Sequence, residues 1–389
     1  MAEGAKPRVA AIITEYRDRA HADVIVTKLL EGYDLYGVHT DPRVEVASIY
    51  LDQTPANDMG VAMAAKHGVP IFDTIGEALS LGGSGIAVDG VLLIGEHGAY
   101  PINELGQKLY PRRRFFDAAV SAMTAGGRIV PLFNDKHLSW SFADARRMYD
   151  TARRLGIPFL AGSSIPVAWR VPRSFEVPMG TPIEEAVAVG YGPLEAYGYH
   201  ALEALQCMVE RRAGGEQGVR SVQHVSGDAL RQAADGGRWD AALADAAMLA
   251  VAGPERAAIA RTAIEHAFLI EYIDGLKATV LMCAEGVADF SFAARSRGET
   301  FACRIALEPG PPYGHFTFLT RQIESLVLTG VSPYPVERTL LTTGMIDAVM
   351  RSRHESSARL ETPELAIAYE PVIEVPDTGV NAEPPFVPA

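Results

Sequence analysis

The segment PLFNDKHL places three chemically active side chains in succession, at Asp135, Lys136 and His137. In an extended chain alternate residues face the same side, so Asp135 and His137 would lie together and Lys136 opposite them. A lysine whose pKa is lowered by burial can give and take protons, and an Asp/His pair can bind a divalent metal. The segment therefore predicts proton transfer or metal binding. The alternative without a chemical role is a charged loop that caps the next helix.

A second polar stretch follows the apolar run VLLIG and contains Glu96, His97, Tyr100 and Glu104 within nine residues. It offers two carboxylates, an imidazole and a phenol. Glu96 and His97 are adjacent, so they face one ligand only if the turn twists. We expect Tyr100 and Glu104 to bind a polar substrate. We expect Glu96 and His97 to complete a metal site with the aspartate and histidine of the first segment.

A run of three arginines, Arg112 to Arg114, begins the next helical stretch. Guanidinium groups bind carboxylates and phosphates through paired hydrogen bonds, so Arg113 is predicted to bind an anionic substrate. A basic helix start without a ligand is an equally good interpretation.

The stretch LEAYGYHALEALQCM places His200 and Glu203 three residues apart, with Tyr197 one turn before His200. On a helix these side chains share a face, and the glutamate could orient the imidazole for proton transfer. We predict a catalytic role for His200 and substrate binding for Tyr197. A histidine that serves only packing between domains is the alternative.

The first turn between a strand and a helix, ITEYRDRAHAD, has no GxGxxG motif, the motif that brings backbone amides close to the diphosphate of a dinucleotide. Glu15 and Asp18 would stand at two glycine positions and add bulk and negative charge. Arg17 could offset that charge. Asp52, at the end of the second predicted strand, lies where a ribose hydroxyl would be bound.

These segments belong to a regular alternation of strands and helices from Arg8 to about Ser164. Helices are expected near residues 20–32, 57–67, 75–81, 114–125 and 142–155. Strands are expected in RVAAII, VEVASIYLD, VPIFD, VDGVLLIG, GRIVPLF and IPFLAGS. This alternation predicts a parallel sheet covered on both faces, with ligands bound beyond the carboxyl ends of its strands.

After about Ser164 the pattern changes. Four consecutive β-like runs, AFLIEYI, LKATVLMCA, DFSFAARS and TFACRIALE, predict an open, mostly antiparallel sheet. Helices are expected near 194–212, 315–328 and 336–353, with an alanine-rich helical patch near 227–252. The fold class is therefore α/β, with a Rossmann-like domain at 1–165, an α+β domain at 166–360 and a Pro-rich tail at 361–389.

Composition excludes several classes of function. The chain has 389 residues, 48% of them hydrophobic, and a net charge of −13, which disfavours binding to nucleic acid. It has no apolar run long enough to cross a membrane and no signal-peptide pattern, so a cytoplasmic protein is expected. The three cysteines show no metal-binding spacing and are expected to be buried thiols.

Several blocks resemble the Gfo/Idh/MocA family, the relatives of glucose-fructose oxidoreductase and inositol dehydrogenase. RAHAD resembles the segment after the family's glycine loop, and DKHL lies where the family has Glu-Lys-Pro. The other similar blocks are AAKHGVPIFDTIGEAL, VDGVLLIG, YGYHALEAL and SPYPVERTLLTTGMIDAVMRSR. Three features depart from the family: the loop glycines are absent, His137 replaces a proline, and Ala196 replaces an aspartate before His200.

The resemblance implies a Rossmann domain and an α/β domain whose open sheet packs in homodimers or homotetramers. It implies a substrate like a sugar, cyclitol or hydroxy acid in the interdomain cleft, with Lys136 and His200 as the catalytic residues. Because the glycines are missing, our first hypothesis is acid/base or metal-assisted chemistry (a lyase, isomerase or hydrolase) with a degenerate NAD-binding motif. The alternative is an NAD(P)-dependent dehydrogenase that binds the diphosphate through Arg17 or Arg19. A non-catalytic binding subunit is the third hypothesis.

Overall fold

The structure is a computed structural model that describes residues 5–386, and it divides into two units. Unit 1 contains the chain up to Pro101, Lys108–Ser164 and Pro309–Val336. Unit 2 contains Ile102–Gln107, Ile165–Glu308 and the chain from Glu337 onward. The change of unit after Ser164 lies beside the boundary expected near residue 165. Residues 309–336, which we had assigned to the second domain, belong instead to unit 1.

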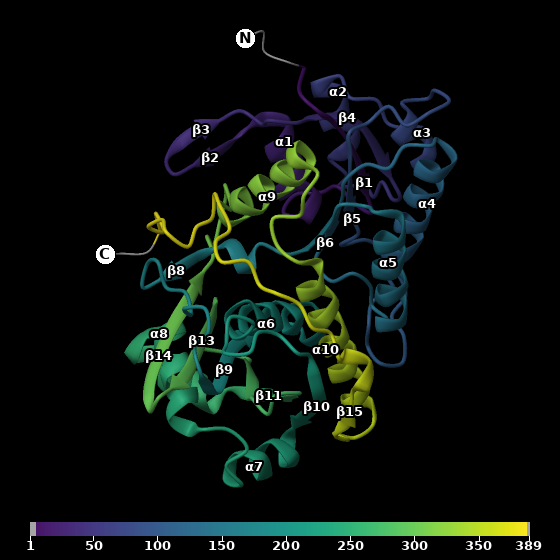
Figure 1. The fold of residues 1–389 in the computed structure, drawn as a ribbon. Coiled ribbons are helices and arrows are strands. Elements are labelled where there is room, and N and C mark those ends of the chain that lie inside the picture. Colours follow the sequence, from purple (N-terminus) through teal and green to yellow (C-terminus); the bar gives the residue numbers. More distant parts are fainter. Residues whose placement is uncertain (1–4, 387–389) are drawn as a thin grey trace. The chain divides into compact units, whose positions relative to one another are not determined.

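Unit 1 is built on a parallel sheet of five strands in the order β4-β1-β5-β6-β7 (Figure 1). The strands are β1 (Arg8–Ile13), β4 (Glu45–Leu51), β5 (Gly90–Ile94), β6 (Leu132–Asp135) and β7 (Phe159–Gly162). All residues of β5 are buried, as the continuous apolar run predicts for a strand covered on both faces. The predicted Rossmann-like parallel sheet is confirmed.

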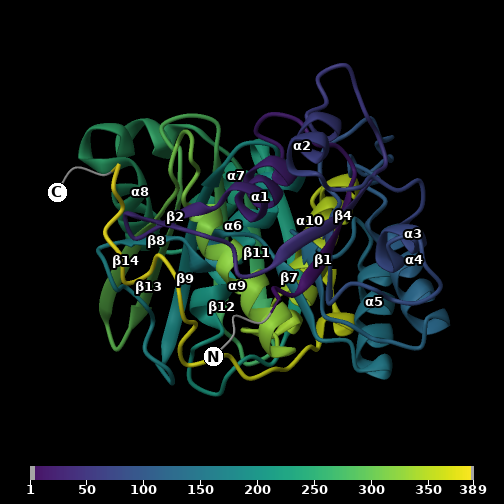
Figure 2. The same ribbon diagram turned by 90° about the horizontal axis from the view of Figure 1, so that it is seen from above.

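Helices cover both faces of this sheet, with α3, α4 and α5 on one side and α1 and α9 on the other (Figures 1 and 2). Their bounds are α1 (Lys28–Glu31), α2 (Gly60–His67), α3 (Ile75–Ser80), α4 (Arg112–Ala125), α5 (Phe142–Leu155) and α9 (His315–Thr329). The side chain of Thr74 accepts a hydrogen bond from the backbone of Glu77 and so caps α3.

Three parts of unit 1 differ from expectation. The first helix is a π-helical turn, η1 (Asp23–Thr27), followed by the four residues of α1. A hairpin of β2 (Tyr33–Leu35) and β3 (Val38–Thr40) follows it and was not predicted. The segment VPIFD forms only an isolated bridge, between Ile71 and Ile49, because its short apolar run ends at Asp73.

Unit 2 contains an eight-stranded sheet in the order β15-β10-β11-β12-β9-β13-β14-β8. All neighbouring pairs are antiparallel except β12 and β9, so the predicted open, mostly antiparallel sheet is confirmed. The strands are β8 (Trp169–Val171), β9 (Ile183–Tyr191), β10 (Val219–Ser226), β11 (Ile264–Tyr272), β12 (Lys277–Cys283), β13 (Phe290–Ser296), β14 (Glu299–Ala306) and β15 (Leu360–Glu361).

The two faces of this sheet are covered by different helices, α6 (Leu194–Val209) on one and α7 (Gly227–Asp235) with α8 (Ala241–Thr262) on the other. A Cβ on Gly190 would lie 2.8 Å from the Cβ of Ala201, so α6 approaches β9 closely at a glycine. Val187 and Val189 alternate with Gly190 along the strand and therefore face α8.

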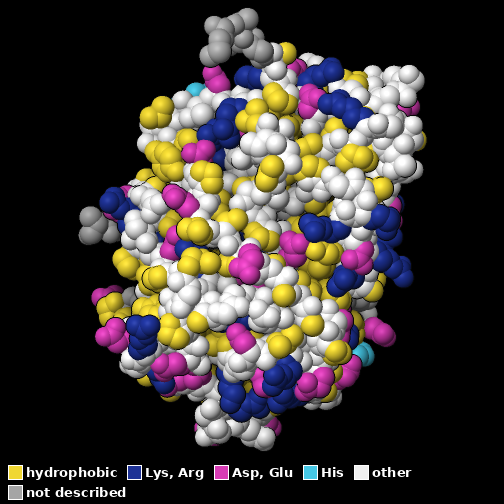
Figure 3. Space-filling view, viewed as in Figure 1, with side chains coloured by type: hydrophobic (Ala, Val, Ile, Leu, Met, Phe, Trp, Pro, Cys, Tyr) yellow, Lys and Arg dark blue, Asp and Glu magenta, His cyan; other side chains and the backbone are white. Residues whose placement is uncertain are grey.

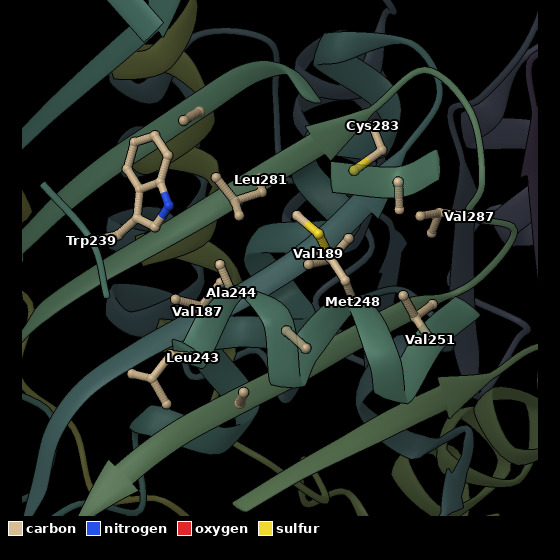
Figure 4. Close-up of a cluster of buried hydrophobic side chains, with 14 of the residues drawn as sticks. Val187, Val189, Trp239, Leu243, Ala244, Met248, Val251, Leu281, Cys283 and Val287 are labelled. Atoms are coloured by element: carbon tan, nitrogen blue, oxygen red, sulfur yellow. The ribbon is translucent and has the colours of Figure 1, made fainter. Parts of the chain in front are cut away.

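Figure 4 shows these two valines packed with Leu243 and Met248 of α8. The resemblance implies subunit contacts through this open sheet, and the apolar part of the face lined by Val187 and Val189 is buried by the chain's own helices.

The remaining elements of unit 2 are η2 (Ile165–Val167), α10 (Val336–His354) and η3 (Pro363–Leu365). The C-terminal stretch, expected as an extended tail, packs onto this unit: Leu365, Ile367 and Val380 are buried. Its backbone also bonds to unit 2, because Gly379 donates to the carbonyl of Val167. The segment is therefore part of the second core.

Two composition-based expectations can be compared with the structure. The three cysteines are free and buried, as predicted. In the part of the chain that the structure describes, no helix is long and apolar enough to cross a membrane. Acidic and basic side chains are interspersed on the face that Figure 3 draws.

The packing of α8 gives a first testable prediction. Leu243→Ala is expected to lower the free energy of unfolding by about 2–5 kcal/mol, because the fully buried leucine would leave a cavity between α8 and the sheet. The matched control is Leu249→Ala in the same helix, where the side chain is 50% exposed. Denaturant unfolding followed by circular dichroism measures both variants, and equal losses would contradict this packing.

Candidate active site

The candidate site lies in unit 1 at the carboxyl ends of β1, β5 and β6. The chain reverses its direction of travel across the sheet between β1 and β5, and ligands of open parallel sheets bind at such a point. Thr14 joins the two loops that begin there, since its hydroxyl donates to the carbonyl of Glu96 over 2.5 Å. The residues that follow these strands therefore share one edge of the sheet.

A buried charged cluster of Lys136, Glu96 and Arg112 occupies this edge. The Nζ of Lys136 donates to one carboxylate oxygen of Glu96 over 2.9 Å, and Arg112 donates to the other over 2.6 Å. All three side chains are at most 6% exposed. Burial raises the pKa of Glu96, but the charges of Lys136 and Arg112 outweigh it, and the net shift is well below the usual value. Glu96 is therefore an anion that holds two cations.

The backbone explains how the cluster forms. Lys136 has a φ of +54°, a left-handed conformation that turns its side chain away from the line of β6. Gly95 allows the arginine to approach, because a Cβ there would lie 2.6 Å from the Cγ of Arg112. Arg112 also donates to Nε2 of His137 over 3.0 Å. Lys136 and His137 are adjacent in the sequence but therefore bind different partners, Glu96 and Arg112.

A second cluster, His21 with Asp135, lies in the same unit. Nδ1 of His21 lies 2.9 and 2.7 Å from the two carboxylate oxygens of Asp135, which is fully buried at the end of β6. The imidazole also packs edge-on against Phe316 and His97, with ring centroids 5.4 and 5.7 Å apart. Burial lowers the pKa of His97 to about 3, so this second imidazole is neutral.

The turn after β1 carries charge in place of glycine. Arg17 donates to Glu15 over 2.5 Å and to Nδ1 of His97 over 3.2 Å, which places its guanidinium between the loops after β1 and β5. The backbone N–H of Arg19 is bound by the carboxylate of Asp23 over 3.0 Å. A donor at the start of the helix is therefore already occupied by an anion from the chain itself.

Asp52, just beyond β4, accepts hydrogen bonds from Tyr50, Tyr100 and Arg114 over 2.6–2.7 Å. Burial raises its pKa, but these hydrogen bonds together outweigh that effect and lower the pKa below the usual value. Asp52 is therefore an oriented carboxylate.

The residues predicted to bind a metal are engaged with other side chains. In the described part of the chain, no group of three or more His, Cys, Asp or Glu side chains is arranged to hold a metal ion. The physical reason is pairing: Glu96 binds two cations, Asp135 binds His21, and His137 accepts from Arg112. This arrangement does not support a metal held by some of Glu96, His97, Asp135 and His137, and the metal site stays a prediction.

The predicted substrate-binding residues are not all in one place. Tyr100 belongs to the site edge through Asp52. Arg113 forms ion pairs with Asp117 in the same helix and with Asp144 in α5, and its binding of an anionic substrate stays a prediction. Glu104 is exposed in the short segment that belongs to unit 2.

In unit 2, α6 brings His200, Glu203 and Tyr197 together. Nδ1 of His200 lies 3.5 Å from Glu203, which is 1% exposed. The ring of Tyr197 meets that of His200 edge-on at 5.9 Å. This confirms the shared helix face, and the catalytic role of His200 stays a prediction.

Sequence reasoning missed His21, Arg112 and Phe316. A signal for His21 was present, because it follows the first strand and belongs to the same sheet edge as Asp135. The arginine run gave no means to distinguish the buried Arg112 from its neighbours. Phe316 comes from α9, far away in the sequence, and the signal near it was the adjacent His315, which follows the PGPPYG turn.

Comparisons with known proteins agree on the fold. No protein-family model matches the sequence, and no curated protein matches it significantly. Among solved structures, GenD2 from gentamicin A biosynthesis in complex with NAD is 14% identical, with a TM-score of 0.58 over 92% of this chain and 97% of that one. Myo-inositol dehydrogenase from Lactobacillus casei in complex with NAD(H) and myo-inositol is 11% identical, with a TM-score of 0.56 over 92% and 96% of the chains.

Scyllo-inositol dehydrogenase from the same organism, with bound NAD(H) and scyllo-inositol, is 10% identical with a TM-score of 0.54, over 92% of this chain and 99% of that one. These likenesses confirm the two-part fold that the resemblance to the Gfo/Idh/MocA family predicts.

The nicotinamide cofactor of these neighbours can be tested against the residues present here. The backbone mode of diphosphate binding does not fit, because residues 14–22 contain no glycine and Asp23 occupies the N–H of Arg19. A donor set made of side chains does fit. Arg17 has five N–H donors, and three of them are engaged within the chain, which leaves two for a diphosphate. A carboxylate such as Asp52 accepts about four hydrogen bonds, and three are made within the chain, which leaves one for a ribose hydroxyl.

Proposed function

We propose that this protein is an NAD(P)-dependent dehydrogenase that oxidises a small polyhydroxylated compound of the cyclitol or sugar type. The observation that carries the proposal is the buried Lys136 side chain, held by Glu96 at the end of β6, on a fold like that of inositol dehydrogenases. The comparisons favour this interpretation over the lyase, isomerase or hydrolase chemistry that the missing glycines had placed first.

The residues of unit 1 supply the proton half of such a reaction. Lys136, as a neutral amine, would bind the reacting hydroxyl of the substrate and take its proton as the carbonyl forms, and so become the ammonium that Glu96 stabilises. Glu96 fixes the direction of the ammonium group, and Arg112 shares the charge of that carboxylate. The nicotinamide, when bound, accepts the hydride.

The binding of the cofactor is expected to depend on Arg17, with Asp52 accepting from a ribose hydroxyl. Arg17→Ala should weaken the binding of NADH at least about tenfold, since it removes a guanidinium that would donate two hydrogen bonds to the diphosphate. Glu15→Gln should strengthen it, because a carboxylate beside the diphosphate disappears. The matched control is Arg147→Ala on α5, whose side chain is 70% exposed. Calorimetric titration measures NADH binding by all three variants, and equal losses for Arg17→Ala and Arg147→Ala would refute this donor set.

The activity itself is tested with a panel of hydroxylated compounds and both oxidised cofactors. Purified protein would be mixed with NAD⁺ or NADP⁺ and with myo-inositol, scyllo-inositol, glucose or gluconate, and the absorbance of the reduced cofactor followed. We expect steady reduction with at least one pair. The absence of reduction with every pair would count against the proposed substrate class.

Redox-independent acid/base chemistry on the same kind of substrate is the second candidate. It is favoured by the first turn, where Glu15 and Asp23 stand beside the place that a diphosphate would occupy. Isomerisation or elimination of a panel compound without any cofactor, followed by proton NMR, would identify it.

The expectation of a homodimer or homotetramer stays a proposal. Because α8 covers the apolar part of the sheet face in unit 2, subunit contacts would have to use another surface. Analytical ultracentrifugation measures the state directly.

A further inference from the structure

The pair His21 and Asp135 has the geometry of an acid/base dyad, and the reaction step proposed above does not use it. Both carboxylate oxygens of Asp135 lie within 2.9 Å of Nδ1 of His21. A carboxylate anion only accepts hydrogen bonds, so Nδ1 carries the proton in this contact. In a neutral ring Nε2 then holds the free lone pair, and the carboxylate stabilises the ring once Nε2 is protonated.

The surroundings hold the imidazole in a single orientation. The carboxylate fixes one edge of the ring, and Phe316 meets it at an interplanar angle of 77°. His97 meets it at 64° on another side and is neutral, because burial lowers its pKa to about 3. Arg17 donates to Nδ1 of His97 and so fixes the tautomer of that ring as well. Two oriented imidazoles therefore lie together at the sheet edge.

The imidazole of this dyad is more exposed to solvent than the buried lysine. The side chain of His21 is 13% exposed, whereas Asp135 is fully buried and Lys136 is 4% exposed. A proton taken by a buried lysine needs a route to water, and a partly exposed imidazole on the same sheet edge can provide one end of it. The adjacent positions 135 and 136 thus support two different proton-transfer groups, one through His21 and one directly.

We propose that His21 is the second proton-transfer group of this protein, which receives the proton from Lys136 and releases it to water, and that Asp135 is its positioning residue. The Nζ–H bond that Lys136 gains from the substrate hydroxyl breaks as Nε2–H forms on His21, so the proton moves to the imidazole while the Nδ1–H contact with Asp135 is kept. The proton later leaves from Nε2 to water. The inference rests on the proposed function for the identity of the substrate, but the state of the ring does not depend on it.

The first test measures the ring itself by nitrogen-15 NMR of the full chain at neutral pH. The expected result is a His21 ring protonated at Nδ1 with Nε2 free, and loss of that preference in Asp135→Asn, which removes the acceptor charge and keeps the shape. The exposed pair His39 and Asp41, 4.0 Å apart, is the matched control, and Asp41→Asn should leave His39 unchanged. A wild-type His21 protonated only at Nε2 would overturn the dyad.

The second test uses turnover with a reactive compound of the panel. His21→Gln should lower kcat about 100- to 10,000-fold, while the dissociation constant of NADH stays close to the wild-type value. His39→Gln should change neither. A variant His21→Gln with full kcat, beside an inactive Lys136→Met, would end the dyad proposal and leave the proposed function intact. No NADH binding and no turnover in the wild type would end the proposed function, and the NMR result would then decide the dyad alone.

Discussion

Lys136→Met is expected to lower kcat/KM for the reactive compound at least about 1,000-fold, while binding of NADH is retained. Methionine keeps the length and apolar stem of the side chain but cannot take or give a proton. It also leaves Glu96 with Arg112 as its remaining cation, so the fold keeps one of the two ion pairs. Stopped-flow or steady-state assays measure the rate, and calorimetry measures the binding.

The matched control is Lys66→Met on α2. The Nζ of Lys66 also binds a carboxylate, that of Glu31, but its side chain is 61% exposed. We expect unchanged turnover for this variant. If Lys136→Met retained more than about a tenth of the wild-type rate, Lys136 would not be the group that moves the proton.

Arg338→Met is expected to lower the free energy of unfolding by about 3–5 kcal/mol. Arg338 forms a paired ion contact with Glu210, with distances of 2.8 and 2.5 Å, and both side chains are at most 5% exposed. The hydroxyl of Tyr369 also donates to Glu210. Removal of the arginine leaves a buried carboxylate with a single neutral donor, and this is the main cost.

Arg351→Met in the same helix is the control, because its side chain is 37% exposed and its carboxylate partner Glu364 is similarly accessible. Its effect should stay within about 1 kcal/mol. Chemical denaturation followed by circular dichroism compares the two variants. Similar losses would show that burial of the Glu210 pair is not what makes Arg338 important.

The fold could be predicted further than the site. The alternation of apolar strands and amphipathic helices gave the parallel sheet of unit 1, because strands buried on both faces leave an unmistakable apolar run such as that of β5. The hairpin of β2 and β3 was missed because each strand has three residues and little periodicity. The first helix was predicted at residues 20–32 and the chain is helical over 21–31, but its π-helical turn was not foreseen, because the apolar pattern continues through it.

The site was predicted in part. Lys136 was found from its place after β6 and from the family resemblance. Asp135 and His137, its neighbours in the sequence, were assigned to a metal because carboxylates and imidazoles are common metal ligands. Which side chain each of them binds depends on what lies opposite it in the folded sheet. The left-handed conformation of Lys136 decides this, and the sequence does not indicate it. Arg112 could not be distinguished from Arg113 for a similar reason, since burial depends on the packing of α4 beside Gly95.

The most direct test of the central claim is a calorimetric titration of freshly purified protein with NADH and with NADPH. A dehydrogenase that holds its cofactor through Arg17 and Asp52 should bind one of them with a dissociation constant in the micromolar range, about −8 kcal/mol. Absence of binding up to about millimolar concentration, roughly −4 kcal/mol, would contradict the account. The charged turn after β1 would then mark a site for redox-independent chemistry.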